Sequence, residues 1–166
     1  MAYWGRVGAG DLGVRIVNEL AAEDVDVSAV RRVPGALSSS DAILVDPNEE
    51  RLICTYTDPA LDPDPSWLPL DRVARFDAVL ADVRWPAGAA RLFAAAAAAG
   101  IPAIFDGDVG PPESLLDLAR RATHLAFSEP GLVQAAGVDA VGAALERIAA
   151  AVAGIVGVTL GADGFL

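Results

Sequence analysis

The spacing of apolar residues changes character along the chain. Near the N-terminus, an apolar run at residues 2–7 predicts a strand, and apolar positions at helical spacing predict a helix at 11–22. Three short runs then alternate between apolar and polar residues, which predicts strands at 29–33, 38–46 and 51–57. Residues 46–50 have the composition of a turn, so the last two runs should form a hairpin. Because no helix interrupts these three runs, we expect one small antiparallel patch.

The second half of the chain alternates regularly between strand-like and helix-like segments. Strands are predicted at 77–82, 101–105, 123–127 and 155–160, and helices at 86–99, 113–121, near Gly131 and at 139–153. Pro86 in the first turn and Gly100 after the last turn mark the bounds of the first of these helices. Repeated strand–helix–strand spacing predicts an α/β fold with a mostly parallel sheet flanked by helices. Residues 58–69 form a proline-rich acidic connector, and its Asp-Pro steps are typical of turns.

Polar residues follow each predicted strand of the second half. Ligands of parallel sheets collect beyond the carboxyl ends of the strands, so these residues form a candidate site. They are Asp82 with Arg84, Asp106 with Asp108, Ser128 with Glu129, and Thr159 with Gly161, Asp163 and Gly164. Carboxylates beside a glycine-rich turn suit a magnesium–nucleotide, because Mg²⁺ binds carboxylates together with water and phosphate oxygens.

Composition narrows the classes of function. The chain has 166 residues and is 54% hydrophobic, which suits one domain with a sizeable core. Its net charge of −11, with no lysine, argues against nucleic acids and anionic membranes as partners. No apolar stretch approaches the ~20 residues of a membrane span, and the N-terminus lacks the features of a signal peptide. We therefore expect a cytoplasmic protein.

The single cysteine and the single histidine offer little support for hydrolytic or metal chemistry. Cys54 lies in an alternating apolar run and is predicted to be a buried structural thiol. One cysteine can form neither an internal disulfide nor a cysteine-based metal site. His124 begins an apolar run and is predicted to be a structural residue at a strand edge. A hydrolase with a Ser-His-Asp or Cys-His arrangement is therefore poorly supported.

A glycine-rich turn near the N-terminus allows a second interpretation of the chain. The spacing Gly8-x-Gly10-x-x-Gly13 matches the fingerprint of NAD(P)-binding oxidoreductase domains, in which glycines let a pyrophosphate approach a helix N-terminus. Such a domain also requires a parallel strand that ends in an acid about 20 residues later. Asp24 and Asp26 lie in that region, but the residues around them make a poor strand.

Motifs along the chain, in order, resemble those of the ribokinase-like (PfkB) carbohydrate kinases. Residues 7–13 resemble the early motif V-G-x-D-x-x-G, and residues 24–30 resemble the following G-V-D-x-S-x-V. The hairpin that contains residues 48–51 is similar to the sugar lid of the family, and residues 155–164 resemble the strand and turn V-T-L-G-x-x-G. The resemblance extends from Tyr3 to the last residue. It implies a ribokinase-like fold over 1–166, with lid strands inserted at about 29–57.

The resemblance also implies that this is a partial chain. The residues Gly8-Ala9-Gly10-Asp11 have the same sequence as the catalytic GAGD motif of the family. They belong, however, to the part of the chain that resembles the early motif V-G-x-D-x-x-G, so Asp11 is expected to be a helix N-cap and not the catalytic base. The N-terminal sugar-binding segment and the C-terminal half with the true GAGD base are expected to lie outside these residues. The N-x-x-E motif of the family aligns with residues 128–131, where Ser128 replaces Asn and Gly131 replaces Glu.

The function that this resemblance implies is phosphoryl transfer from MgATP to a sugar hydroxyl, with the present residues inactive on their own. ATP and Mg²⁺ are the implied cofactors, and a homodimer through the β lid is the implied assembly. The implied nucleotide-binding residues are Ser128, Glu129, Thr159, Gly161, Asp163 and Gly164. The implied substrate-binding residues are Arg84, Asp106 and Asp108, and a guanidinium at this position suggests an anionic sugar. A non-catalytic protein that dimerises through the lid is the remaining alternative.

Overall fold

The computed structural model describes residues 1–47, 51–61 and 63–166. The chain forms two compact units, Met1–Pro63 and Asp64–Leu166. Each unit is described separately below, and the single domain expected over residues 1–166 stays a prediction. None of the helices in the described ranges is long and apolar enough to cross a membrane.

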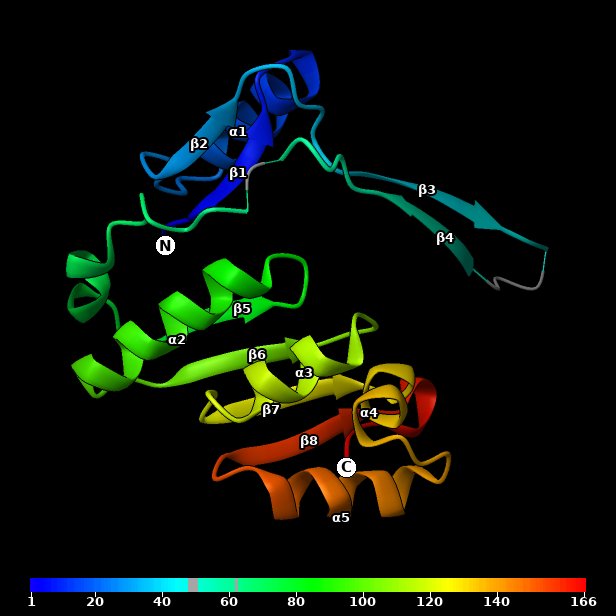
Figure 1. The fold of residues 1–166 in the computed structure, drawn as a ribbon. Coiled ribbons are helices and arrows are strands. Elements are labelled where there is room, and N and C mark those ends of the chain that lie inside the picture. Colours follow the sequence, from blue (N-terminus) through cyan, green and yellow to red (C-terminus); the bar gives the residue numbers. More distant parts are fainter. Residues whose placement is uncertain (48–50, 62) are drawn as a thin grey trace. The chain divides into compact units, whose positions relative to one another are not determined.

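The first unit begins with a strand–helix–strand arrangement. β1 (Gly5–Gly8) and β2 (Val30–Val33) pair in parallel, with Gly5 opposite Val30, and α1 (Asp11–Ala22) connects them (Figure 1). The prediction that residues 29–33 join an antiparallel patch is therefore wrong. The crossover through α1 returns the chain to the starting end of β1, so β2 runs in the same direction as β1.

The predicted hairpin is confirmed. β3 (Ser40–Val45) pairs antiparallel with β4 (Arg51–Tyr56), and Leu44 lies opposite Leu52. Residues 48–50 of the predicted turn lie outside the described residues. Cys54 is exposed, so its predicted burial is wrong. The alternation of apolar residues indicates a strand correctly, but the residues of β3 and Cys54 of β4 are exposed in the described part of the chain.

The second unit contains a parallel sheet, as predicted. Its strand order is β5 (Val79–Asp82), β6 (Ala103–Gly107), β7 (His124–Ser128) and β8 (Ile155–Thr159). The helices are α2 (Pro86–Ala99), α3 (Pro112–Ala119), α4 (Glu129–Ala136) and α5 (Val141–Ala151). Two 3-10 helices, η1 (Leu70–Arg75) and η2 (Gly161–Asp163), were not predicted.

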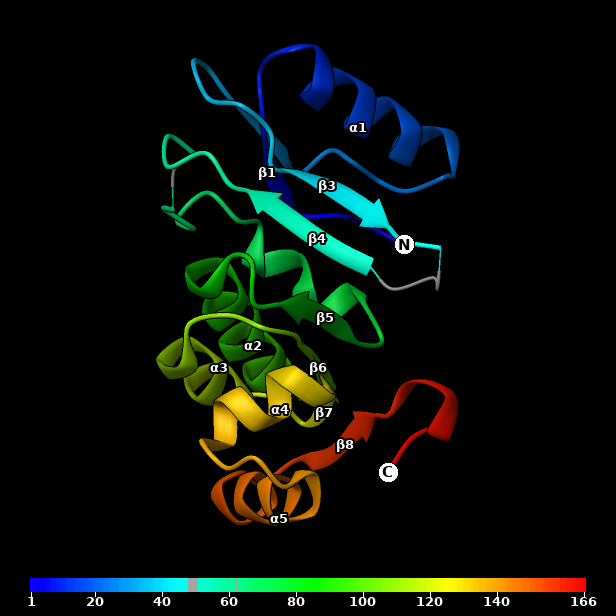
Figure 2. The same cartoon turned by 90° about the vertical axis from the view of Figure 1, so that its right-hand side faces the viewer.

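The core of the second unit lies between the helices and one face of the sheet. Figure 2 shows α2, α3 and α4 on the same side of the strands. The Phe105 ring on β6 packs edge-on against Phe93 of α2 and Phe127 of β7, with centroid distances of 6.3 and 5.8 Å. Fully buried leucine and isoleucine side chains from α3, α4 and α5 complete this layer. The burial of these side chains holds the carboxyl ends of the strands in register.

Candidate functional site at the carboxyl ends of the strands

The register of the parallel sheet brings the predicted polar residues to one edge. Asp82 at the end of β5 lies opposite Asp106 of β6, and Ser128 at the end of β7 lies opposite Thr159 of β8. The strands are short and nearly equal in length, so each one leaves the sheet at a similar level. The sequence therefore predicted correctly that these residues share the carboxyl edge of the sheet.

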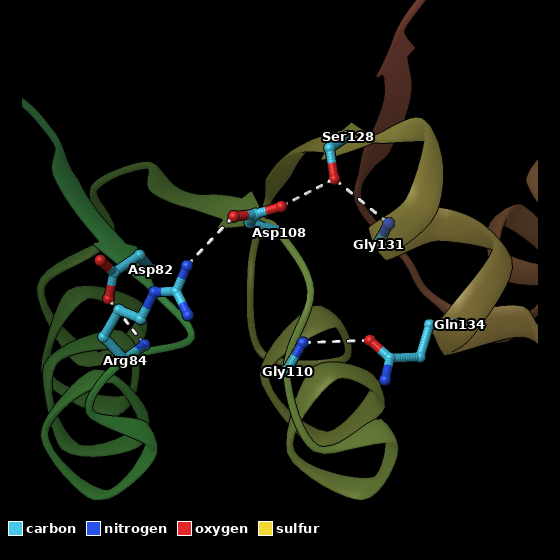
Figure 3. A network of polar contacts seen from close by, with 7 residues as sticks. All are labelled: Asp82, Arg84, Asp108, Gly110, Ser128, Gly131 and Gln134. Carbon is cyan, nitrogen blue, oxygen red and sulfur yellow. Dashed lines mark hydrogen bonds and ion pairs between the residues drawn. The ribbon is translucent and has the colours of Figure 1, made fainter. Parts of the chain in front are cut away.

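Asp108, in the loop after β6, is the centre of a polar network at this edge (Figure 3). Its Oδ2 accepts from Arg84 Nη2 at 3.2 Å, and its Oδ1 accepts from Ser128 Oγ at 3.0 Å. Ser128 Oγ also accepts from the backbone N–H of Gly131 at 3.1 Å, which caps the N-terminus of α4. One carboxylate thus connects the ends of β5 and β7 to the start of a helix. We call Arg84, Asp108 and Ser128 the strand-end network.

Backbone contacts hold this network in place. The Arg84 N–H donates to Asp82 Oδ1 at 2.9 Å, which closes the turn after β5. The Gly110 N–H donates to Gln134 Oε1 at 3.0 Å and attaches the loop after β6 to α4, as Figure 3 shows. Sequence reasoning missed Gln134, because a single glutamine in a short helix carries no pattern that indicates a distant loop as its partner.

This edge carries carboxylates and one guanidinium, and their clearest effect is on the pKa of Asp106. Partial burial raises the pKa of the Asp106 carboxyl, and repulsion from Asp82 and Asp108 raises it further, while Arg84 opposes the rise. Arg84 and Asp108 are each about half exposed, at 53% and 47% of their side-chain surface, so solvent can exchange with a ligand here. Carboxylates and a guanidinium in this arrangement can accept hydrogen bonds from hydroxyl groups and donate them to an oxyanion.

This pKa shift predicts a pH-dependent gain in stability for Asp106→Asn. A raised pKa means that ionisation of Asp106 destabilises the folded state at neutral pH, whereas below the ordinary value of 3.8 both states hold the proton. We expect the variant to have a higher free energy of unfolding at pH 7, by less than about 1 kcal/mol because solvent screens the charges. Urea unfolding between pH 3 and 7 should show the gain shrinking as the pH falls.

The exposed Asp139 provides a matched control for this measurement. Asp139→Asn changes the same functional group outside the acidic edge, so its effect should stay within about 0.5 kcal/mol throughout the pH range. Destabilisation by Asp106→Asn at pH 7 would contradict the electrostatic description of the edge.

The other predicted nucleotide-binding residues lie at the same edge but outside the strand-end network. Thr159 Oγ1 donates to the carbonyl oxygen of Phe127 at 3.2 Å, and Glu129 is the exposed first residue of α4. Gly161 and Gly164 have φ angles of 57° and 95°, and the exposed Asp163 lies between them. The tight turn at 160–164 needs these glycines, because other residues rarely adopt such angles. It sends the chain back along β8.

Asp11, His124 and the candidate metal ligands also have defined positions. Asp11 is the first residue of α1 and Gly10 is its N-cap, so the predicted capping role of Asp11 is wrong. Its charge still suits the positive end of the helix dipole. His124 is the exposed first residue of β7 and lies 2.9 Å from Thr123 Oγ1. Within the described ranges, no group of three or more histidine, cysteine or acidic residues could hold a metal ion.

The glycine-rich turn of the first unit is filled by its own chain. The Gly8 N–H donates to the buried Ser38 Oγ at 3.0 Å, and a Cβ atom on Gly8 would lie 2.3 Å from the carbonyl oxygen of Ala36. β2 is followed by Pro34 and not by an acid, and Asp24 and Asp26 precede this strand. The geometry therefore opposes the NAD(P)-binding interpretation, because the glycines admit a protein segment where a pyrophosphate would have to lie.

Comparisons with known proteins agree with this geometry. The family model for pfkB family carbohydrate kinases matches residues 1–166. A structure from Agrobacterium tumefaciens, provisionally described as a ribokinase, is 39% identical with a TM-score of 0.90, and the match covers 99% of this chain and 54% of that chain. We refer to it as the Agrobacterium relative.

Two more distant structures show the same fold. Ribokinase from Giardia lamblia is 16% identical with a TM-score of 0.82, and the match covers 99% of this chain and 55% of that chain. Ribokinase from Arabidopsis thaliana, complexed with ribose and ATP, is 20% identical with a TM-score of 0.74, and the match covers 99% and 56%. The chain therefore spans about half the length of these proteins. It belongs to the pfkB family of carbohydrate kinases.

Proposed function

We propose that these residues are part of an ATP-dependent kinase that phosphorylates a hydroxyl group of a sugar or nucleoside. The observation that carries the proposal is the match to the family over the whole chain, with the polar residues gathered at the carboxyl edge of the sheet. The Arabidopsis ribokinase is described with ribose and ATP, and a nucleoside kinase from Burkholderia thailandensis, similar in fold, is described with inosine. Both descriptions support a polyhydroxylated acceptor.

In this proposal, the strand-end network and its neighbours divide between two ligands. Arg84, Asp106 and Asp108 bind the acceptor: the carboxylates accept hydrogen bonds from sugar hydroxyls, and the half-exposed guanidinium donates to an oxyanion of an anionic sugar. The second group, at the ends of β7 and β8, lies beside the nucleotide. It comprises Ser128, Glu129, Thr159, Gly161, Asp163 and Gly164.

The proposed reaction is in-line transfer of the γ-phosphoryl group to the acceptor oxygen. A general base removes the hydroxyl proton, and the charge that develops on the phosphoryl oxygens must be neutralised. Mg²⁺ would supply that neutralisation when it arrives bound to ATP, with carboxylates of this edge near its water shell. We propose that the base lies outside residues 1–166. The isolated chain should therefore show no turnover of ATP with any sugar.

A chimera permits a test of the acceptor site in a complete protein. Residues 1–166 replace the matched part of the Agrobacterium relative, which retains the remainder of its own chain. We expect Arg84→Ala in this chimera to weaken the binding of a sugar phosphate by about 10- to 100-fold, since a charge-assisted hydrogen bond is worth about 1.5–3 kcal/mol. Binding of the corresponding free sugar should change less than about threefold. Calorimetric titration measures both.

The control for this experiment is Arg91→Ala, which removes an exposed arginine from α2. It changes the net charge equally, so a loss of affinity from charge alone should appear in both variants. Equal losses of affinity for the neutral and the anionic sugar in Arg84→Ala would contradict the recognition of an oxyanion.

We also propose that the hairpin β3–β4 forms a homodimer. One of its faces carries Ala42, Leu44, Leu52, Cys54 and Tyr56, because alternate residues of paired strands point to the same side. Leu44 and Leu52 are 60% and 61% exposed. An apolar ribbon of this kind is stabilised when a second copy covers it.

Leu52→Asp should weaken this dimer at least tenfold in sedimentation equilibrium, because the carboxylate would be buried without a partner. Thr55→Asp is the control, since the register places Thr55 with Ile43 and Ile53 on the opposite face of the ribbon. A dimer that is unaffected by Leu52→Asp, or no dimer at millimolar concentration, would contradict the proposal.

A further inference from the structure

The turn that carries Arg84 contacts a distant part of the sequence through an aromatic pair. The ring of Trp85 stacks on that of Trp67 in the proline-rich connector, with a centroid distance of 5.6 Å and an interplanar angle of 19°. Both tryptophans belong to the second unit, and both are half-buried. Stacked rings stabilise their arrangement beyond the burial of apolar area alone. We call Trp67 and Trp85 the tryptophan pair. It joins the connector to the residue that follows Arg84.

A glycine in the first turn of α2 leaves room for this pair. A Cβ atom on Gly88 would lie 2.4 Å from two ring carbons of Trp85, so the indole lies directly against the helix backbone. Trp85 is the N-cap of α2, but its side chain makes no capping hydrogen bond. Its carbonyl oxygen accepts the Ala89 N–H at 2.9 Å. The indole therefore fixes the start of α2 by packing, where a polar N-cap residue would do so by hydrogen bonding.

Short-range contacts fix the segment that presents Trp67. The Asp64 carboxylate accepts from the Ser66 N–H at 3.0 Å and from the Ser66 hydroxyl at 2.5 Å. The Leu68 N–H donates to the carbonyl oxygen of Pro65 at 3.1 Å, and the Leu68 side chain is buried. These contacts restrict the backbone on both sides of Trp67, so its ring is a fixed support for the ring of Trp85.

The polar contacts of Arg84 are too weak to fix its position alone. Its ion pair with Asp108 is about half exposed, and exposed ion pairs contribute little to stability (Figure 3). Its backbone N–H donates to Asp82 in an exposed turn. The two neighbours of Arg84 in the sequence are apolar: Val83 is 4% exposed, and Trp85 is stacked. Burial of the first and stacking of the second therefore place the backbone of Arg84.

We propose that the tryptophan pair positions Arg84, and that Trp67 is the positioning residue through which the connector sets the preference for an anionic acceptor. This inference rests on the proposed function, in which the Arg84 guanidinium donates to an oxyanion of the acceptor. An arginine side chain loses conformational freedom when it binds a ligand, and a turn that is already fixed reduces this loss. Removal of the stack should therefore weaken the binding of an anionic sugar and leave that of a neutral sugar nearly unchanged.

Amide hydrogen exchange in the 166-residue chain tests the positioning without any ligand. Trp67→Ala should speed exchange at the Arg84 N–H by about tenfold or more, because the turn opens locally. Gly88→Ala, which displaces the indole, should have the same effect, whereas Gly142→Ala, with nothing within 4 Å of the new Cβ atom, should not. Trp67→Phe keeps a ring for stacking and should restore most of the protection. The Val158 N–H, on β8 at the opposite edge of the sheet, is the internal reference and should keep its rate.

Calorimetric titration of the chimera tests the effect on specificity. Trp67→Ala should weaken the binding of a sugar phosphate by about three- to tenfold, the usual cost of ordering one side chain, and that of the free sugar by less than about twofold. In an Arg84→Ala background, Trp67→Ala should have no further effect on the sugar phosphate, because both residues act through the same contact. Ile148→Val, in the core beside α5, is the control for a general loss of stability and should leave both affinities unchanged.

The two experiments separate this inference from the proposed function. An unchanged exchange rate at the Arg84 N–H in Trp67→Ala would overturn the positioning role. So would a chimera in which Arg84→Ala weakens the sugar phosphate and Trp67→Ala does not, and the proposed function would then stand. Equal losses for the free sugar and the sugar phosphate in Trp67→Ala would also overturn it. If Arg84→Ala itself leaves sugar-phosphate binding unchanged, the proposed oxyanion recognition fails, and the role of Trp67 in specificity is overturned with it.

Discussion

Phe105→Ala should lower the free energy of unfolding by about 3–5 kcal/mol, the usual cost of deleting a fully buried aromatic side chain. Phe105 is 0% exposed and lies on the second strand of the sheet. Its ring packs edge-on against those of Phe93 and Phe127, at interplanar angles of 82° and 90°. Such ring pairs add to the stabilisation that comes from area burial alone. Removal of the Phe105 ring would therefore leave a cavity between the helices and the sheet, beneath the candidate site.

Urea denaturation followed by circular dichroism measures this effect. A loss of this size is a large fraction of the total stability of a typical domain, about 5–15 kcal/mol. Val109→Ala is the control, because Val109 is 45% exposed in the loop after β6 and its truncation should cost less than about 0.5 kcal/mol. A loss below about 1 kcal/mol for Phe105→Ala would show that the core does not lie between these rings.

Gly131→Ala should destabilise the protein by about 2–3 kcal/mol, although alanine is the better residue for a helix. Gly131 lies in the first turn of α4, and its missing side chain lets the helix approach the loop after β6. A Cβ atom there would lie 2.2 Å from the carbonyl oxygen of Gly107 and 3.0 Å from Asp108 C. Both are backbone atoms, so relief requires a shift of α4 or of the loop. Overpacking of this kind usually costs about 1–3 kcal/mol.

Gly142→Ala distinguishes this contact from helix propensity. Gly142 lies in the first turn of α5, and a Cβ atom there would meet nothing within 4 Å. This substitution should stabilise the protein by about 0.5–1 kcal/mol, since alanine orders more easily in a helix than glycine does. The two alanine variants should therefore move the urea midpoint in opposite directions. Stabilisation by both would contradict the close approach of α4 to residues 107–108.

The sheet of the second unit was predictable because its local signals agree with one another. Each strand is a short apolar run, each long helix has apolar positions at helical spacing, and Pro86 and Gly100 mark the bounds of α2. Parallel strands place their carboxyl ends at one edge, so the neighbourhood of Asp106, Asp108 and Ser128 followed from chain order alone. The same rule covers any α/β sheet, and it identifies an edge without assigning a role to any single side chain.

The sequence-based predictions were wrong where similar local patterns of apolar residues have different surroundings in the folded protein. β2 is a short run with strand-forming residues, as β3 and β4 are, but the crossover through α1 places it parallel to β1. Cys54 belongs to an apolar strand and is nevertheless exposed, so periodicity predicts the strand correctly and the burial of the thiol wrongly. Contacts between loops, such as Arg84 with Asp108, depend on side-chain positions that no spacing in the sequence encodes.

The kinase assay on the chimera tests the central claim most directly. A folded chimera that carries residues 1–166 should transfer the γ-phosphoryl group of MgATP to at least one compound in a panel of sugars and nucleosides, whereas the 166-residue chain alone should transfer none. Product formation is followed by mass spectrometry, and cooperative thermal unfolding establishes that the chimera is folded. A folded chimera that phosphorylates no compound in the panel would contradict the proposal that these residues serve a sugar or nucleoside kinase.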